Sequence, residues 1–169
     1  ETTIVPQLLA EIDGVESLDN VIVIGATNRE DMIDPAVLRP GRLDVKIRIN
    51  RPDRACATEI FALYLTEGLP INDEEVTRAG SKQAAIETMI ETVVEALFSA
   101  DPKNRYIRVN LENGVSRWLT RGDFLSGAVV RNIVDHAKKQ AIKSFLAGGA
   151  KGITTQHLLE AARVEFEDQ

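Results

Sequence analysis

The chain has 169 residues, of which 44% are hydrophobic and 27% are charged, a composition typical of a globular protein. No apolar run reaches the roughly 20 residues of a membrane span, and no signal pattern opens the chain, so we expect no membrane partner. The formal net charge of −6 and the scattered basic residues argue against direct binding of nucleic acid. A single cysteine, Cys56, excludes a disulfide-stapled secreted protein and favours a reducing cytoplasm.

The first 50 residues have the pattern of an α/β protein. Apolar residues at helical spacing predict a helix over 4–12, which Asp13 and Gly14 end. The unbroken apolar run 21–26 is typical of a strand buried on both faces of a parallel sheet. A short helix capped by Asp34 is expected at 34–38, and strict alternation predicts a half-buried strand over 43–49.

From residue 51 onward the pattern becomes helical, so we place the boundary at residues 50–53. A polar turn region is expected at 70–81. In a hairpin further along the chain, Trp118 and Tyr106 are candidates to stack across the two strands. The predicted elements are helices over 54–66, 86–97 and 122–146, a last helix capped by Thr154, and hairpin arms 105–110 and 115–120 around Asn113-Gly114.

A ridge of three glutamates lies on the outer face of the second of these helices. Glu87, Glu91 and Glu95 follow one another at four-residue spacing, where like charges repel mildly unless they are partnered. The ridge is interpreted as a solvated face or, alternatively, as an acidic docking surface.

The sequence contains no motif of a metal site or of an activated nucleophile. His136 and His157 lie on separate predicted helices, and one cysteine does not build a zinc site. The glycine-rich phosphate loop that ends in Lys-Ser/Thr is also absent. By this reading the chain alone should neither bind nor hydrolyse a nucleotide in the usual way.

Two segments carry unusual polar residues. Asn28 follows the predicted buried strand, at the edge where open parallel sheets bind ligands, although a turn residue is the simpler interpretation. Arg39 and Arg42 lie on a loop stiffened by Pro35 and Pro40, and the forked guanidinium suits phosphate oxygens. Surface salt bridges are the alternative for the two arginines.

Taken together, residues 9–14, 21–28 and 34–44 resemble the second region of homology of the AAA ATPases. The resemblance implies that Asn28 is the sensor-1 residue, which helps to place the attacking water. It also implies that the arginines of the third segment, Arg39 and Arg42, are arginine fingers that reach the nucleotide of a neighbouring subunit.

Residues 124–128 resemble the turn that opens a helix of the small AAA subdomain, where Gly127 and Ala128 would lie against adenine and ribose. The acidic residue that usually follows is Val129 here, so this match is looser. The implied fold is the C-terminal part of an αβα P-loop NTPase subdomain over 1–50, followed by a mostly helical lid over 51–169. An inserted helix and hairpin occupy the lid near 70–121.

The chain opens at Glu1 without an initiator methionine, in sequence that already reads as helical, so we expect a fragment. The phosphate loop and the acidic ligands of Mg²⁺ would then precede it. We expect the full-length protein to use ATP and Mg²⁺, and the fragment to be inactive and to bind neither. Exposed apolar surface is expected where absent strands would pack.

The insertion over 69–126, together with segments such as 29–35 and 138–144, resembles the actinobacterial proteasome-associated branch of the family. This resemblance implies a cytoplasmic homo-hexamer, an ATP-driven unfoldase that recognises Pup-tagged proteins and threads them into the proteasome core particle. Two alternatives stay open. One is an AAA ATPase of another pathway, such as membrane-complex disassembly, and the other is an inactive AAA-like scaffold.

Overall fold

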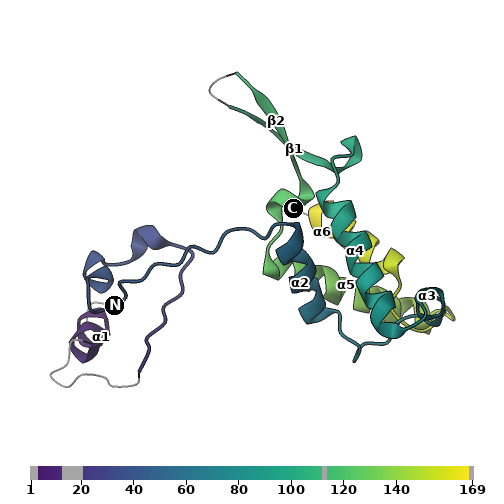
Figure 1. The fold of residues 1–169 in the computed structure, drawn as a ribbon, viewed down its shortest axis with the longest axis horizontal. Coiled ribbons are helices and arrows are strands. Elements are labelled where there is room, and N and C mark those ends of the chain that lie inside the picture. The colour runs from purple at the N-terminus through teal and green to yellow at the C-terminus, as the bar shows by residue number, and fades with distance from the viewer. Residues whose placement is uncertain (1–3, 13–20, 112–113, 168–169) are drawn as a thin grey trace. The chain divides into compact units, whose positions relative to one another are not determined.

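The computed structural model describes residues 4–12, 21–111 and 114–167 (Figure 1). The chain divides into two compact units, Glu1–Ile49 and Asn50–Gln169, which are considered separately below. Among the described residues, no helix combines the length and the apolar composition needed to cross a membrane.

The first unit contains short helices joined by irregular chain. The expected first helix is confirmed as α1 (Ile4–Ile12), whereas its expected stop at residues 13–14 lies outside the described residues. The expected short helix is confirmed as the 3₁₀ turn η2 (Pro35–Leu38), because the Asp34 carboxylate accepts a hydrogen bond from the Ala36 N–H at 2.8 Å. A further 3₁₀ turn, η1 (Glu30–Met32), was not expected.

The prediction of two strands in this unit is wrong. Residues 21–26 and 45–49 are irregular, and their apolar side chains are exposed, with Ile22 at 86% and Ile49 at 87%. A strand is held by hydrogen bonds to neighbouring strands, and no described segment of this unit pairs with either run. The described residues of the first unit therefore contain no sheet, and the α/β prediction is corrected there.

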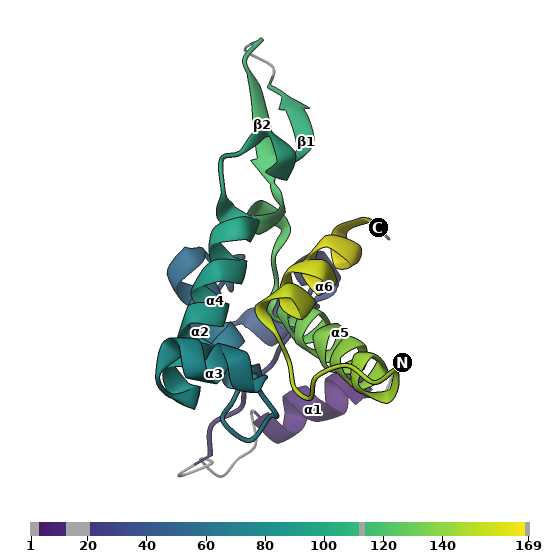
Figure 2. The same cartoon turned by 90° about the vertical axis from the view of Figure 1, so that its right-hand side faces the viewer.

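The second unit is helical, with one small sheet (Figures 1 and 2). Two expected helices are confirmed as α2 (Arg54–Tyr64) and α4 (Lys82–Phe98). A helix, α3 (Asp73–Ala79), replaces part of the expected turn region at 70–81. It has few apolar residues, so periodicity does not reveal it. It is instead defined by its ends, since Asn72 caps it and Gly80 closes it with φ of 84°.

The hairpin is confirmed as β1 (Arg105–Asn110) and β2 (Ser116–Thr120), which pair antiparallel with a bulge between Arg105 and Ile107. The expected stacking of Tyr106 on Trp118 is wrong. Tyr106 lies in the bulge and packs edge-on against Phe124 and Phe166, at centroid distances of 5.4 and 5.6 Å. This contact joins the base of the hairpin to the helices.

The expected helix over 122–146 begins later than predicted. A 3₁₀ turn, η4 (Arg121–Phe124), comes first, and Asp123 closes it by accepting hydrogen bonds from the Thr120 N–H and hydroxyl. The helix α5 (Gly127–Leu146) then begins after Ser126, whose hydroxyl caps it. Of its expected apolar face, Ile142 and Phe145 are more than half exposed.

The last helix is α6 (Thr155–Glu167), and its predicted cap is confirmed, since the Thr154 hydroxyl accepts from the His157 N–H at 3.2 Å. The segment that precedes α3 and the segment that precedes α6 pair with each other at the N-terminus of α6. The Asn72 N–H donates to the Ile153 carbonyl, and the Ile153 N–H donates to the Pro70 carbonyl. The Glu75 carboxylate of α3 also accepts from the Thr155 N–H, so one helix caps another.

The core of the second unit lies among the four long helices. α5 packs on α6 and α2, and α4 packs on α2, α3 and α6. The largest fully buried side chains are Phe61, Leu65, Met89, Leu97, Leu125, Ile133, Ile153, Leu158, Val93, Val130 and Val134. All of them belong to the second unit.

Candidate functional site

Asn28 lies in the irregular segment that leads into η1, and its side chain is exposed. The neighbouring Thr27 hydroxyl accepts a hydrogen bond from the Arg29 N–H at 3.0 Å, which orders the turn locally. Arg29 pairs in a fork with Asp31, at 3.0 and 2.8 Å. That pair lowers the pKa of Asp31, chiefly through the hydrogen bond from Arg29.

The two candidate arginines lie on one tight turn after η2. The Arg42 N–H donates to the Arg39 carbonyl at 3.1 Å, and Gly41 within the turn has a φ of 84°, a conformation that favours glycine. The Arg42 side chain is half-buried, and its guanidinium donates to the Ala36 carbonyl of η2. The Arg39 side chain is exposed and forms no ion pair with a described residue.

These contacts separate the two arginines by role. Arg42 holds its own loop, because its guanidinium bridges back to η2. Arg39 projects from the turn that Arg42 helps to fix, which leaves its forked donors available for an anion. Val37, which is 8% exposed, is the buried anchor of this loop.

Gly127 and Ala128 form the first turn of α5. Ala128 is exposed, and a Cβ built on Gly127 would meet no atom within 4 Å. The α5 N-terminus also offers unpaired backbone N–H groups beside the Ser126 cap. This open space is compatible with the close approach of a ligand.

The structure brings some of the candidates together and leaves others apart. Arg39 and Arg42 share one turn, and Gly127 and Ala128 share another. Asn28 belongs to the first unit with the arginines, and no hydrogen bond joins it to Arg39 among the described residues. The two pairs belong to separate units.

Other reactive side chains have structural partners. Cys56 is exposed on α2, and the pKa of its thiol is raised above the usual range, chiefly by its hydrogen bond to Asp53. Burial lowers the pKa of His157, whose Nδ1 accepts from the Thr154 N–H. Within the described ranges, no three His, Cys, Asp or Glu side chains are grouped as a metal site.

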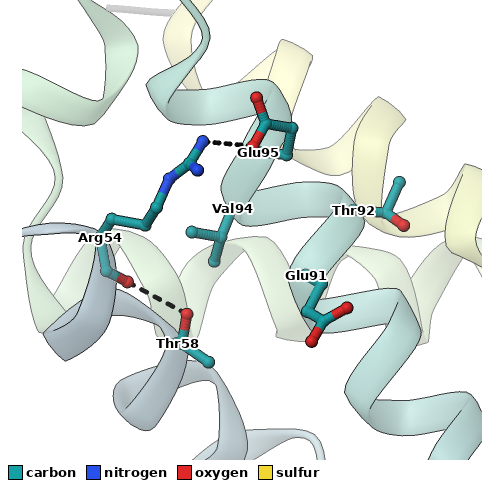
Figure 3. A pocket seen from close by; sticks show the side chains of 6 residues that line it. All are labelled: Arg54, Thr58, Glu91, Thr92, Val94 and Glu95. Atoms are coloured by element: carbon teal, nitrogen blue, oxygen red, sulfur yellow. Dashed lines mark hydrogen bonds and ion pairs between the residues drawn. The ribbon is translucent and has the colours of Figure 1, made fainter.

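A hollow lies between α2 and α4, and the sequence did not predict it (Figure 3). Its volume is about 500 Å³, and Val94 and Thr92 contribute to its lining from α4. Arg54 crosses it to pair with Glu95, and Thr58 donates to the Arg54 carbonyl at 3.0 Å. The glutamate spacing pointed to this face of α4, but the partner from α2 becomes visible only in the fold.

Sequence comparison places these features in a family. The model of the AAA family, ATPases associated with various cellular activities, matches residues 1–51. The model of the ARC AAA+ ATPase lid domain matches residues 52–169. The chain therefore belongs to the AAA ATPase family. More narrowly, its second unit is a lid domain of the ARC type.

Several curated relatives match over nearly the whole chain. An "AAA ATPase forming ring-shaped complexes" from Kocuria rhizophila is 60% identical over 100% of this chain and 30% of its own length. A "proteasome-associated ATPase" from Streptomyces griseus is 57% identical over 99% of this chain and 29% of its own length. Another of that name, from Thermomonospora curvata, is 56% identical with the same coverage. The chain thus spans less than a third of these relatives.

Proposed function

We propose that the full-length protein is an ATPase that assembles as a homo-hexameric ring, unfolds Pup-tagged proteins and delivers them to the proteasome core. The identity of 54–60% to ring-forming and proteasome-associated ATPases, over essentially the whole chain, supports this proposal. In this reading residues 1–50 complete the large nucleotide-binding subdomain. Residues 51–169 form the lid, with the insertion near 70–121, and the protein works in the cytoplasm.

The proposed hydrolysis mechanism rests on one observation, the exposed side chain of Arg39 on a turn that Arg42 fixes. Arg39 presents its N–H donors to phosphate oxygens of ATP bound by the neighbouring subunit. A guanidinium at that position offsets the charge that builds up on the transferring phosphoryl group. Because the residue acts across an interface, hydrolysis depends on assembly.

The remaining candidates have supporting roles in the same proposal. Asn28 orients the attacking water through its amide. Gly127 and Ala128 take the adenine and ribose, and the open space at the Gly127 Cα position fits such a group. ATP, bound with Mg²⁺ in the full-length protein, supplies the phosphoanhydride bond that is broken.

Replacing Arg39 by alanine tests the finger assignment. In the full-length protein, Arg39→Ala is expected to lower ATP turnover by about 10³-fold or more, the effect of removing arginine fingers elsewhere. Nucleotide affinity should change little, because the finger serves a neighbour's site. Arg42→Ala should also lower turnover, but it removes the bond to Ala36 as well, so Arg39 is the sharper probe.

The matched control is Arg48→Ala, which removes another exposed arginine of the same unit and should leave turnover unchanged. If Arg39→Ala retains turnover within about twofold of wild type, the finger assignment is wrong. If no variant and no wild-type ring hydrolyses ATP, the protein is a scaffold and the proposed activity fails.

Gly127→Ala tests the nucleotide contact separately. The added methyl group meets no atom of the chain, so the thermal stability of the lid should be maintained. The affinity of the full-length protein for ATP should fall by about tenfold, because a methyl group occupies space reserved for the nucleotide. Unchanged affinity would remove Gly127 from the site.

A further inference from the structure

The hairpin formed by β1 and β2 extends beyond the helices of the second unit in both views (Figures 1 and 2). Its exposed apolar side chains include Ile107 at 43%, Val115 at 55% and Trp118 at 45%. A two-stranded hairpin is only marginally stable by itself in water. An apolar hairpin that the described helices of its own unit leave uncovered is therefore better suited to a contact with another protein surface than to solvent.

Trp118 is flanked by two arginines on one face of the hairpin. Arg108 is its direct partner on the opposite strand, and side chains of such a pair lie on the same face. Arg105 places its guanidinium 5.7 Å from the centroid of the Trp118 ring, a cation–π contact. Tryptophan and arginine are the residues most enriched at the energetic centres of protein interfaces.

Neither of these arginines forms an ion pair with a described carboxylate. Arg108 donates to the Ser116 hydroxyl at 3.1 Å, which is a neutral acceptor. Residues 103–121 hold five basic residues and one acidic residue, in a chain whose formal net charge is −6. This Trp118 face, defined as Arg105, Arg108 and Trp118, is thus locally basic and fits an acidic partner surface.

The chain itself presents such a surface on α4. Glu87 and Glu91 are exposed on its outer ridge and form no ion pair with a described residue, although the Glu87 carboxylate accepts from the Gln83 amide at 2.7 Å, whereas Glu95 pairs with Arg54. Glu91 also lines the hollow between α2 and α4 (Figure 3). The hollow, which Arg54 crosses to reach Glu95, therefore has one carboxylate without an ion-pair partner among the described residues in its lining, that of Glu91.

We propose that the Trp118 face of one copy docks on the acidic ridge of α4 in a second copy, with the indole against the hollow that Arg54 crosses. Arg105 and Arg108 then pair with Glu87 and Glu91 of that copy. The two surfaces are different patches of one chain, so the contact is head-to-tail and closes into a ring when the rotation permits. This inference deepens the ring assembly of the proposed function by assigning the insertion to a contact between lids.

A charge-reversal experiment tests the contact. Self-association of the 169-residue chain is measured by sedimentation velocity without nucleotide. The double variant Arg105→Glu/Arg108→Glu should raise the dissociation constant by at least about tenfold, because like charges then face one another. The reciprocal variant Glu87→Arg/Glu91→Arg should do the same.

Combining the two variants is the decisive step. A chain that carries all four reversals should recover wild-type association to within about threefold, since the charge pairs are restored with opposite sign. The matched control reverses two basic residues elsewhere, Lys139→Glu/Lys143→Glu on the exposed surface of α5, and should have no effect. Non-specific association through other apolar segments would not show this rescue.

Trp118→Ala provides a second readout, because the exposed indole is not needed to bury the core. It should weaken association by about tenfold while the far-ultraviolet circular dichroism is unchanged. The proposal is overturned if the four-residue combination fails to restore association, or if the control weakens it equally. The assay involves no ATP, so its failure and a failure of the Arg39 experiment are distinguishable.

Discussion

Asp53 serves two functions at the start of α2. Its carboxylate accepts from the Cys56 N–H at 2.9 Å, which caps the helix. It also accepts from the Cys56 thiol, and this hydrogen bond is the main cause of the raised pKa of that thiol. A nearby carboxylate disfavours the thiolate, so an exposed cysteine is kept protonated.

Replacing Asp53 by asparagine is expected to activate Cys56. Asparagine caps the helix equally well but carries no charge, so the pKa of the thiol falls toward its usual value. Alkylation by iodoacetamide at pH 8 should accelerate, and the midpoint of its rate-versus-pH curve should shift to lower pH. Glu59→Gln, which removes a weaker electrostatic cause, should give a smaller change. Equal rates for Asp53→Asn and wild type would contradict this account.

At the scale of elements, the second unit is held together by contacts between the segments that connect its helices as well as by contacts between the helices. The connecting segments around Ile71 and Ile153 form a parallel β-bridge, and the Asn72 side chain donates to the Lys151 carbonyl at 3.3 Å. Gly152 lies within this bridge with φ of 103°. A Cβ there would lie 2.5 Å from the Asn72 nitrogen. Both the backbone conformation and the space require glycine.

Gly152→Ala is expected to destabilise the chain by about 3 kcal/mol, the combined cost of a strained φ and of overpacking. Gly148→Ala is the matched control, because its φ of 88° gives the same strain while its Cβ would meet no atom within 4 Å. It should cost about 1 kcal/mol. Urea unfolding measures both values. Equal losses would show that the close approach to Asn72 has no energetic role.

At the scale of the whole molecule, the buried core belongs to one of the two units. Every member of the main core cluster lies between Ala57 and Phe166, and Val37 is the one buried apolar residue of the first unit among those described. The first unit instead exposes the apolar run around Ile22 and the alternating run around Ile47. Burial of apolar area is the main favourable term in folding, so stability resides in the second unit.

The segment 50–169 expressed alone is therefore expected to fold. Its thermal transition, followed by circular dichroism at 222 nm, should match that of the 169-residue chain to within about 3 °C. The full chain is the control, and its first 49 residues should contribute no separate cooperative transition. Loss of the transition in the shorter segment would show that the first unit contributes to the core.

Local signals determined much of the fold. Helical periodicity identified α1, α2 and α4, the Asn113-Gly114 dipeptide identified the hairpin, and Thr154 identified the start of α6. These signals lie within a few residues of the structure that they predict. Segments with few apolar residues, such as α3, depend on caps and on neighbours and were missed.

In the candidate site, too, the sequence predicted some features and missed others. The residues Asn28, Arg39 and Arg42 were found from motif order, and their roles remain proposals. The sequence did not predict that Arg42 bonds to the Ala36 carbonyl while Arg39 is exposed, because that difference arises from the packing of one turn against η2. The hollow beside Glu91 likewise needs α2 and α4 side by side.

The sequence by itself determined the family, the helical character of the second unit, the hairpin and the caps at Asp34 and Thr154, because these depend on neighbouring residues and on motif spacing. Tertiary structure decided which apolar residues are buried. The runs 21–26 and 43–49 have strand-like sequences, yet they form no strand, since a strand is defined by the segments that pair with it. Tyr106 and Trp118 also lie apart, because Tyr106 is in the bulge and packs against Phe124, whereas Trp118 pairs with Arg108 and is 45% exposed.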